Sequence, residues 1–337
     1  MAETVLVTGG SGFLAGWCAV ELLQRGYEVR TTVRDLSREA EVRAAVGSQV
    51  EANDRLAVLA ADLQSDDSWG EAVSGCAYVL HVASPFPPVQ PKDADELIVP
   101  AREGTLRVLR AALAAGVKRT VITSSVAAVG GGVSSSDPLT EASWTDLDHP
   151  GLSPYVRSKT IAERAAWDLV REAGEPERLA TVNPGAILGP LLSSDGSFSL
   201  QAIERLLKGM PGVPRIGFSF VDARDVAELE IEAMLSPKAG GERFIAVNEF
   251  RWMGDVAAML RQGLGADAGK VPTRKVPDLL VRALALFDPG VRSITGQLGK
   301  RSSYSSAKAR ELLGFSPRPV EETVVETGRS MVEKGVV

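Results

Sequence analysis

The chain has 337 residues, more than one hydrophobic core normally supports, so a large domain with an appended smaller lobe is expected. Its 45% hydrophobic and 24% charged residues are those of an ordinary globular protein and exclude a disordered chain or a fibre. The formal net charge of −6 argues against nucleic acid and anionic membranes as partners, because basic patches bind both.

The two cysteines, Cys18 and Cys76, are too few for a disulfide framework and match no metal-site spacing. A reduced, cytoplasmic protein without a metal is therefore expected. The first expected strand begins at Thr4, which leaves no room for a secretion signal, and no apolar run approaches the roughly 18 residues of a membrane span. The expected partner is a small molecule, and the chain is expected to be a monomer or a homodimer.

Short β-branched runs alternate with helix-period segments through the first half of the chain, a pattern typical of a parallel sheet covered by helices. Strands are expected at residues 4–8, 28–33, 56–60, 78–82, 120–124 and 179–183. Helices are expected at residues 13–25, 65–73, 103–115 and 154–172. Right-handed crossovers between successive strands then predict an α/β fold, a doubly wound parallel sheet of the Rossmann type.

The regular alternation stops after Pro184 and Gly185, where glycine and serine become frequent. A return strand at 218–221, a helix at 225–235 and a strand at 244–247 are expected further along. We interpret 1–185 and 218–249 as the Rossmann domain. Residues 186–217 and 250–337 are expected to form a smaller, discontinuous substrate-binding lobe.

The segment Thr8-Gly9-Gly10-Ser11-Gly12-Phe13-Leu14-Ala15 follows the first strand and opens the first helix. Glycines at such a turn let backbone N–H groups and a helix N-terminus approach a pyrophosphate. The alternative is a tight strand-to-helix turn without a ligand. Because the turn lies between the first strand and the first helix, we interpret it as the phosphate-binding turn of a dinucleotide cofactor.

The end of the second strand sets the choice of dinucleotide, because an acidic side chain binds the ribose of NAD and an arginine binds the 2′-phosphate of NADP. Here Arg34 ends the strand and Arg38 follows, which predicts NADPH. Asp35 leaves a ribose contact open, and a solvated Arg34 is the other alternative. After the third strand, Asp62 and Leu63 are expected at the adenine, with a turn or capping role for Asp62 as the alternative.

Tyr155 and Lys159 stand four residues apart at the start of a predicted helix, so both side chains lie on one face. A tyrosine with the ordinary pKa of about 10 is a poor acid–base catalyst unless a nearby cation stabilises its phenolate. Lys159 supplies that charge. Ser125, preferred over Ser124 at the end of the fifth strand, is placed to hydrogen-bond a substrate oxygen. An exposed tyrosine–lysine pair and an ordinary turn serine are the alternatives.

Together these elements resemble the extended short-chain dehydrogenase/reductase family, in particular its dihydroflavonol reductase-like and methylglyoxal reductase-like carbonyl reductases. The stretches that carry the resemblance are 7–17, 32–35, 81–85, 123–125, 155–167, 183–185 and 220–226. The resemblance implies that Ser125, Tyr155 and Lys159 carry catalysis. The cofactor contacts expected from the residues and the resemblance together are Gly9, Gly12, Phe13, Leu14, Arg34, Arg38, Asp62, Leu63, Val82, Ala83, Ser84, Tyr155, Lys159, Pro184 and Gly185.

Two positions depart from the family's pattern. Many relatives place an asparagine of a proton relay where this chain has Ala101, three residues before Gly104. The dihydroflavonol reductases have a substrate-binding asparagine where this chain has Gly130, which makes dihydroflavonol reduction doubtful and is expected to leave room in the pocket. His81, in the fourth strand, is expected to be structural and not a general base.

The expected reaction is hydride transfer from NADPH to an uncharged ketone or aldehyde with a hydrophobic substituent. An epimerase or dehydratase of nucleotide sugars is the alternative, although sugar dehydratases usually show Asp-Glu where this chain has Ser124-Ser125. A non-catalytic NADP-sensing protein is a third possibility, against which the tyrosine–lysine pair counts. The substrate is expected to lie under an apolar, mobile lid that includes Leu191, Leu192, Phe198 and Leu200.

Overall fold

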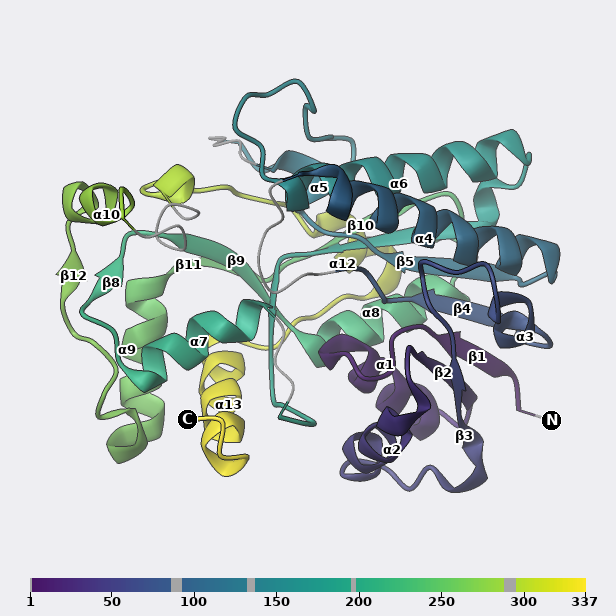
Figure 1. The fold of residues 1–337 in the computed structure, drawn as a ribbon, viewed down its shortest axis with the longest axis horizontal. Helices are drawn as coiled ribbons and strands as arrows, with labels where there is room; N and C mark the ends of the chain where they lie inside the picture. Colours follow the sequence, from purple (N-terminus) through teal and green to yellow (C-terminus); the bar gives the residue numbers. More distant parts are fainter. Residues whose placement is uncertain (1, 86–92, 132–136, 195–197, 288–294) are drawn as a thin grey trace.

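A parallel sheet runs through the centre of the molecule (Figure 1). The computed structural model describes residues 2–85, 93–131, 137–194, 198–287 and 295–337. Within these ranges seven strands pair in the order β10-β6-β5-β4-β1-β2-β3, every pair parallel. The predicted doubly wound fold is confirmed. Its strands are β1 (Thr4–Val7), β2 (Glu28–Val33), β3 (Leu56–Ala60), β4 (Tyr78–His81), β5 (Arg119–Thr123), β6 (Leu179–Pro184) and β10 (Arg243–Ala246).

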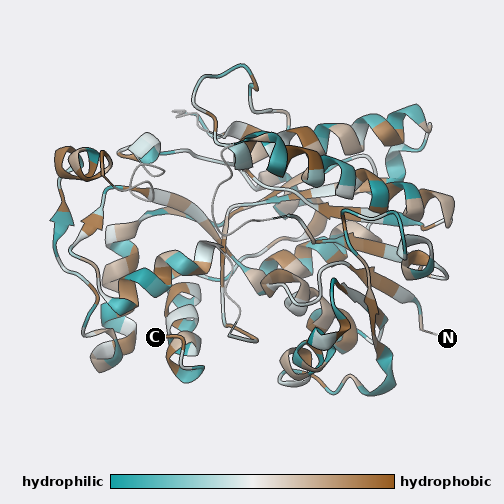
Figure 2. Ribbon diagram, viewed as in Figure 1, coloured by the Kyte–Doolittle hydropathy of each residue, from teal (hydrophilic) through white to brown (hydrophobic). Residues whose placement is uncertain are grey.

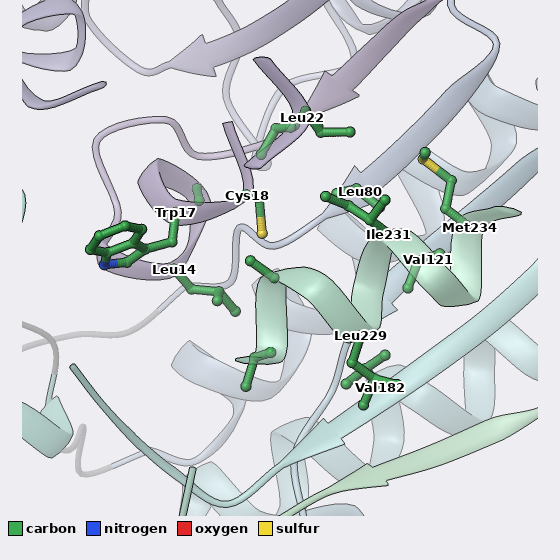
Figure 3. Close-up of a cluster of buried hydrophobic side chains, with 14 of the residues drawn as sticks. Leu14, Trp17, Cys18, Leu22, Leu80, Val121, Val182, Leu229, Ile231 and Met234 are labelled. Carbon is green, nitrogen blue, oxygen red and sulfur yellow. The ribbon is translucent and has the colours of Figure 1, made fainter. Parts of the chain in front are cut away.

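Helices cover both faces of this sheet (Figure 1). Val5 and Val7 of β1 pack into the cluster with α1 and α8, whereas Leu6 between them packs with α3 and α4 on the other face. Figure 3 shows side chains of α1 and α8 meeting those of the central strands. Burial on both faces explains why the inner strands β1 and β4 are almost continuous apolar runs. Brown predominates along the central strands in Figure 2. The flanking helices are α1 (Phe13–Gln24), α2 (Glu39–Gly47), α3 (Trp69–Val73), α4 (Asp95–Ala114), α5 (Ala127–Gly130), α6 (Pro154–Glu172) and α8 (Ala223–Leu235).

Helix α4 begins earlier than predicted. It starts at Asp95 and not at residue 103, and it contains Pro100. Proline lacks the N–H that would bond the carbonyl of Glu96. Glu96 is exposed in the first turn, where water can satisfy that carbonyl, so the proline is tolerated and does not mark the helix start.

A smaller lobe is built on a second sheet of β11, β9 and β7, with β8 paired to β12 beside it. Its helices enclose a separate apolar cluster. The carboxyl-terminal α13 packs against α9 and α7 (Figure 1). The strands are β7 (Ala186–Leu188), β8 (Val213–Pro214), β9 (Gly217–Asp222), β11 (Glu249–Trp252) and β12 (Lys275–Val276), and the helices are α7 (Phe198–Lys208), α9 (Met253–Leu264), α10 (Asp278–Leu284) and α13 (Val320–Glu333).

The chain passes between the two lobes at β9. This strand pairs with β7 and β11 and not with the central sheet, although residues 218–221 were expected in the Rossmann domain. Phe220 packs in the smaller lobe, and the next residue, Val221, packs under the central sheet. Conversely, α12 (Ala307–Leu313) packs on β10 and α8, within the segment expected in the smaller lobe. The domain boundaries therefore stay a prediction.

Candidate active site

The predicted site residues lie in a row along one edge of the central sheet. Because all its strands are parallel, their carboxyl ends meet at that edge, and the strand order reverses between β1 and β4. Such a row suits an extended ligand laid across the strand ends. From one end to the other it holds Asp62 and Leu63 after β3, Arg34 after β2, Gly9 to Gly12 after β1, Val82 to Ser84 after β4, Ser125 after β5, and Pro184 and Gly185 at β6.

The glycine-rich turn between β1 and α1 has the geometry of an anion site. Gly9 has a φ of +78°, which favours glycine, and its N–H donates to Thr32 Oγ1 at 3.1 Å. A Cβ on Gly9 would lie 3.0 Å from the Ala83 side chain, so the turn approaches β4 closely. Helix α1 begins after Gly12 without a side-chain cap, which leaves the N–H groups of its first turn, including those of Phe13 and Leu14, available to a phosphate.

The prediction of an apolar lid formed by these leucines is wrong. Leu191, Leu192 and Leu200 are buried. Leu191 and Leu200 fill the core of the smaller lobe, and Leu192 packs with α1 beside the glycine-rich turn. The N–H of Leu191 also donates to Ser330 Oγ at 2.9 Å, which ties this segment to α13. Leu191 and Leu200 are therefore core residues of the smaller lobe, and Leu192 joins this segment to α1. The Phe198 side chain lies outside the described part of the chain.

At the end of β2, Arg34 and Arg38 differ in availability. Arg34 is exposed and makes no hydrogen bond or ion pair with the described residues. Arg38 donates to both carboxylate oxygens of Glu41, with Nε–Oε2 at 3.0 Å and Nη2–Oε1 at 2.8 Å. The Asp35 carboxylate accepts the N–H of Ser37 at 2.8 Å and caps a short helical turn. Arg34 is thus more available than Arg38 to bind a phosphate. The Asp35 carboxylate is already used to cap the turn.

Asp62 and Leu63 lie where β3 meets α4. Asp62 Oδ1 accepts the N–H of Gln64 at 2.9 Å, as expected for the alternative turn role, and its other oxygen makes no hydrogen bond with the described residues. A Cβ on Gly104 would lie 2.8 Å from the Leu63 Cβ, so the glycine lets α4 approach this loop. Ala101, one turn before Gly104, is buried and offers no polar atom to a proton relay.

Ser125, Tyr155 and Lys159 come together at the ends of β5 and the start of α6. Ser153 caps α6, accepting the Val156 N–H at 3.3 Å, and so fixes the helix that carries the tyrosine and the lysine. Burial raises the pKa of Tyr155, and a hydrogen bond with Ser125 lowers it in part. Burial lowers the pKa of Lys159 to about 8. The Lys159 ammonium donates to the backbone carbonyl oxygen of Thr123 at 3.4 Å.

A buried polar network beneath these residues was missed from the sequence. Its centre is Glu163, one turn after Lys159 and 1% exposed. Glu163 accepts hydrogen bonds from Ser124 Oγ and from Asn183 Nδ2, the latter at 2.7 Å. Asn183 Nδ2 also donates to the Ser125 carbonyl oxygen at 3.1 Å. The network therefore fixes the end of β5 against α6, and it explains why Ser125 and not Ser124 is free to meet Tyr155.

His81, at the end of β4, is buried beside the site. Its Nδ1 lies 2.9 Å from Thr8 Oγ1, which accepts the N–H of Ala83 at 3.0 Å. This hydrogen bond between the imidazole ring and the Thr8 hydroxyl holds His81 against the end of β1. Burial and the charge of Lys159 lower the pKa of His81 to about 3. The ring is therefore neutral, in agreement with the structural role expected for it.

Pro184 and Gly185 close the row at the end of β6. A Cβ on Gly185 would lie 2.2 Å from the Ser219 carbonyl oxygen, so the glycine allows β6 and β9 to approach. The pocket space expected beside Gly130 is absent. A Cβ there would lie 2.1 Å from Leu139 Cδ1, because that leucine already fills the position.

Comparison with known proteins matches residues 5–247 to the family model described as the NAD dependent epimerase/dehydratase family. The chain belongs to that family. The predicted resemblance to extended short-chain dehydrogenases/reductases and the use of an NAD-type dinucleotide are thereby confirmed.

Several similar curated proteins are named as reductases. The chain is 34% identical to a cinnamoyl-CoA reductase of Medicago truncatula, over 99% of this chain and 97% of the relative. It is 31% identical to a dihydroflavonol 4-reductase of Zea mays, over 99% of this chain and 90% of the relative. Although the family model is named after epimerases and dehydratases, these relatives of the chain are oxidoreductases.

Two solved structures share the fold over almost the whole chain. Yeast methylglyoxal/isovaleraldehyde reductase Gre2, complexed with NADPH, has a TM-score of 0.82 at 24% identity and covers 99% of this chain and 100% of its own. Gre2 of Candida albicans, also complexed with NADPH, has a TM-score of 0.80 at 26% identity, covering 98% and 99%. In the described part of this chain, no helix is long and apolar enough to cross a membrane, and no group of three metal-ligating side chains gathers.

Proposed function

We propose that this protein reduces a ketone or an aldehyde to an alcohol with NADPH, using Ser125, Tyr155 and Lys159. The observation that carries the proposal is the hydrogen bond between Tyr155 and Ser125 at the carboxyl edge of the sheet, with Lys159 one turn further along α6. Reductase relatives over 99% of the chain support the same reaction class.

The residues at the strand ends fit the cofactor. The uncapped N-terminus of α1 and the close glycine-rich turn suit a pyrophosphate, and the exposed Arg34 suits the 2′-phosphate that distinguishes NADPH. The neighbouring structures in complex with NADPH support this choice. When bound, the cofactor supplies the hydride that reduces the carbonyl carbon.

The chain's own residues handle the oxygen and the proton. Ser125 donates a hydrogen bond to the substrate oxygen as negative charge develops on it. Tyr155 then donates the proton that completes the alcohol. Lys159, with its ammonium held at the Thr123 carbonyl oxygen, favours the tyrosinate that this transfer leaves. A phenol raised in pKa by burial needs that assistance.

The substrate class proposed is an uncharged carbonyl compound. The basic side chains of α7 do not indicate a diphosphate site: Lys208 is exposed and pairs with Glu204 at 2.6 Å, and Arg205 is also exposed. The epimerase or dehydratase alternative keeps the family description in its favour. A competition between ketones and UDP- or dTDP-sugars, with NADPH oxidation and sugar products both followed, separates the two.

Tyr155→Phe tests the catalytic assignment, because it removes the proton donor and keeps the ring. Turnover of carbonyl compounds should fall by roughly 10²–10⁴-fold while NADPH binding is retained. Tyr78→Phe is the matched control, since Tyr78 begins β4 at the opposite edge of the sheet. A folded Tyr155→Phe protein with the normal turnover rate would contradict the assignment.

A further inference from the structure

Glu230 is a buried carboxylate that the proposed chemistry does not use. It lies on α8, which packs against β5 on the face opposite to α6, and it is 0% exposed. Figure 3 shows its neighbours on α8, Leu229 and Ile231, directed into the core between the helix and the sheet. A carboxylate in such surroundings is costly unless it is paired or hydrogen-bonded, so its presence needs an explanation.

The hydrogen-bond partners of Glu230 are both neutral. Thr123 Oγ1 donates to Glu230 Oε1, and Cys18 Sγ donates to Oε2 at 3.4 Å. No Lys, Arg or His among the described residues forms an ion pair with it. The other buried carboxylate near the site, Glu163, differs in this respect, because Arg243 Nε donates to it at 2.7 Å. Glu230 is therefore a buried carboxyl group without a directly bound cation among the described residues.

Lys159, in turn, is a cation that forms no ion pair with a described carboxylate. Its ammonium is held by a neutral group, the backbone carbonyl oxygen of Thr123. The same Thr123 presents its hydroxyl to Glu230. One residue at the end of β5 thus connects a cation on one face of the sheet to an anion on the other.

The charges of the two groups act on each other. Burial raises the pKa of Glu230 to about 7, and the Lys159 charge opposes that rise. Burial lowers the pKa of Lys159 to about 8, and the charges of Glu163 and Glu230 oppose that fall. Among the described residues, the other titratable groups near the pair are Cys18 from α1, His81 from β4 and Tyr155 from α6. Burial raises the pKa of Cys18 and Tyr155 and lowers that of His81, so all three are neutral at neutral pH.

We infer that Glu230 is a positioning residue for Lys159: it supplies a second buried negative charge, besides that of Glu163, that favours the protonated lysine, and it fixes Thr123, which receives the ammonium. The inference rests on the proposed function for its catalytic consequence. The charge on Glu230 forms as the pH rises through neutrality, so its support for the Lys159 cation is greatest in alkaline solution, where the lysine would otherwise lose its proton.

Glu230→Gln removes the charge and keeps the size and an acceptor for Thr123. In the isotopically labelled full-length protein, the Lys159 side-chain resonance should titrate about 1 pH unit lower than in wild type, the lower end of the effect of a nearby opposite charge. The alkaline limb of the kcat/KM profile should move with it, giving about tenfold lower activity above that limb and little change in acid. Glu232→Gln, on the same helix but half-exposed and paired with Arg25, is the matched control and should leave both curves unchanged.

Cys18→Ala provides a second variant if Glu230→Gln does not fold. It removes one hydrogen bond to the carboxylate without changing charge, so Glu230 should ionise at higher pH and Lys159 should show a smaller shift in the same direction. An unchanged Lys159 titration in Glu230→Gln, or a loss of activity equal at every pH, would overturn the inference. The Lys159 resonance is measured without substrate, so its titration does not depend on the proposed reaction. Normal turnover in Tyr155→Phe would overturn the proposed function but would not affect the coupling between Glu230 and Lys159.

Discussion

Arg243 Nε donates to Glu163 Oε1 at 2.7 Å, and both side chains are buried, with 8% and 1% of their surface exposed. The Arg243 guanidinium also lies over the ring of Trp144, 3.7 Å from its centroid. Through Glu163 this ion pair holds Ser124 at the end of β5. The geometry of the candidate catalytic residues therefore depends on an ion pair contributed by β10 and α6, beside the ligand edge and not on it.

Glu163→Gln should strongly destabilise the protein. The substitution leaves the Arg243 guanidinium buried without its carboxylate, a change that typically costs about 3–5 kcal/mol. Glu204→Gln, which breaks the exposed pair with Lys208, should cost about 1 kcal/mol or less. Urea unfolding of the two variants measures the difference. Equal losses in the free energy of unfolding would show that the buried pair contributes no more to stability than the exposed pair.

Glu230 should make the wild-type protein less stable as the pH rises from about 5 to about 8. Its pKa is higher in the folded chain, about 7, than the ordinary value of 4.5, so the folded state binds more protons than the unfolded state over this interval. The loss of stability is on the order of 3 kcal/mol. Glu230→Gln removes this contribution, so its melting temperature relative to wild type should increase with pH. A constant difference across the interval would contradict the buried ionisation.

Arg34→Ala should weaken NADPH binding by about 1–3 kcal/mol, the scale of a charge-assisted hydrogen bond. NADH binding should change little, because NADH lacks the 2′-phosphate, and this makes it the internal control. Arg38→Ala should have the smaller effect, since Arg38 is already bonded to Glu41. Dissociation constants from cofactor fluorescence measure all of these. Equal NADPH affinity in wild type and Arg34→Ala would remove Arg34 from the site.

Gly185→Ala should destabilise the junction of the two lobes. Its Cβ would overlap the Ser219 carbonyl oxygen, so β6 or β9 must shift, and such overpacking typically costs about 1–3 kcal/mol. Gly47→Ala is the control at an open helical position, where alanine should stabilise by roughly 0.5–1 kcal/mol. Thermal unfolding should give changes of opposite sign in the two variants, and a stabilising Gly185→Ala would contradict the described contact.

The parts of the fold that follow from local pattern were predictable. Two-sided burial makes the inner strands rich in apolar and β-branched residues, so their positions could be read from the sequence. Parallel strands bring their carboxyl ends to one edge, so Arg34, Ser125 and Pro184 could be assigned to a common row from their positions at strand ends. The four-residue spacing of Tyr155 and Lys159 also needs only helix geometry.

The buried polar network and the shape of the pocket depend on tertiary contacts, which the spacing of residues along the sequence does not reveal. Glu163 and Glu230 look like ordinary helical glutamates, and only packing shows that both are buried around β5. The lid leucines illustrate the opposite error, because apolar side chains in a glycine-rich segment filled a core where an exposed cover was expected. The space beside Gly130 is likewise taken by Leu139, a residue nine positions away that no local pattern connects to it.

The most direct test of the central claim is a single turnover with NADPH deuterated at C4 of the nicotinamide. The purified protein is mixed with an uncharged aromatic or aliphatic ketone, and the alcohol is examined by mass spectrometry. We expect one deuterium on the carbinol carbon of the alcohol formed by the wild type, and the same product formed roughly 10²–10⁴-fold more slowly by Tyr155→Phe. Conversion of UDP- or dTDP-sugars with no deuterated alcohol from any carbonyl compound would contradict this expectation.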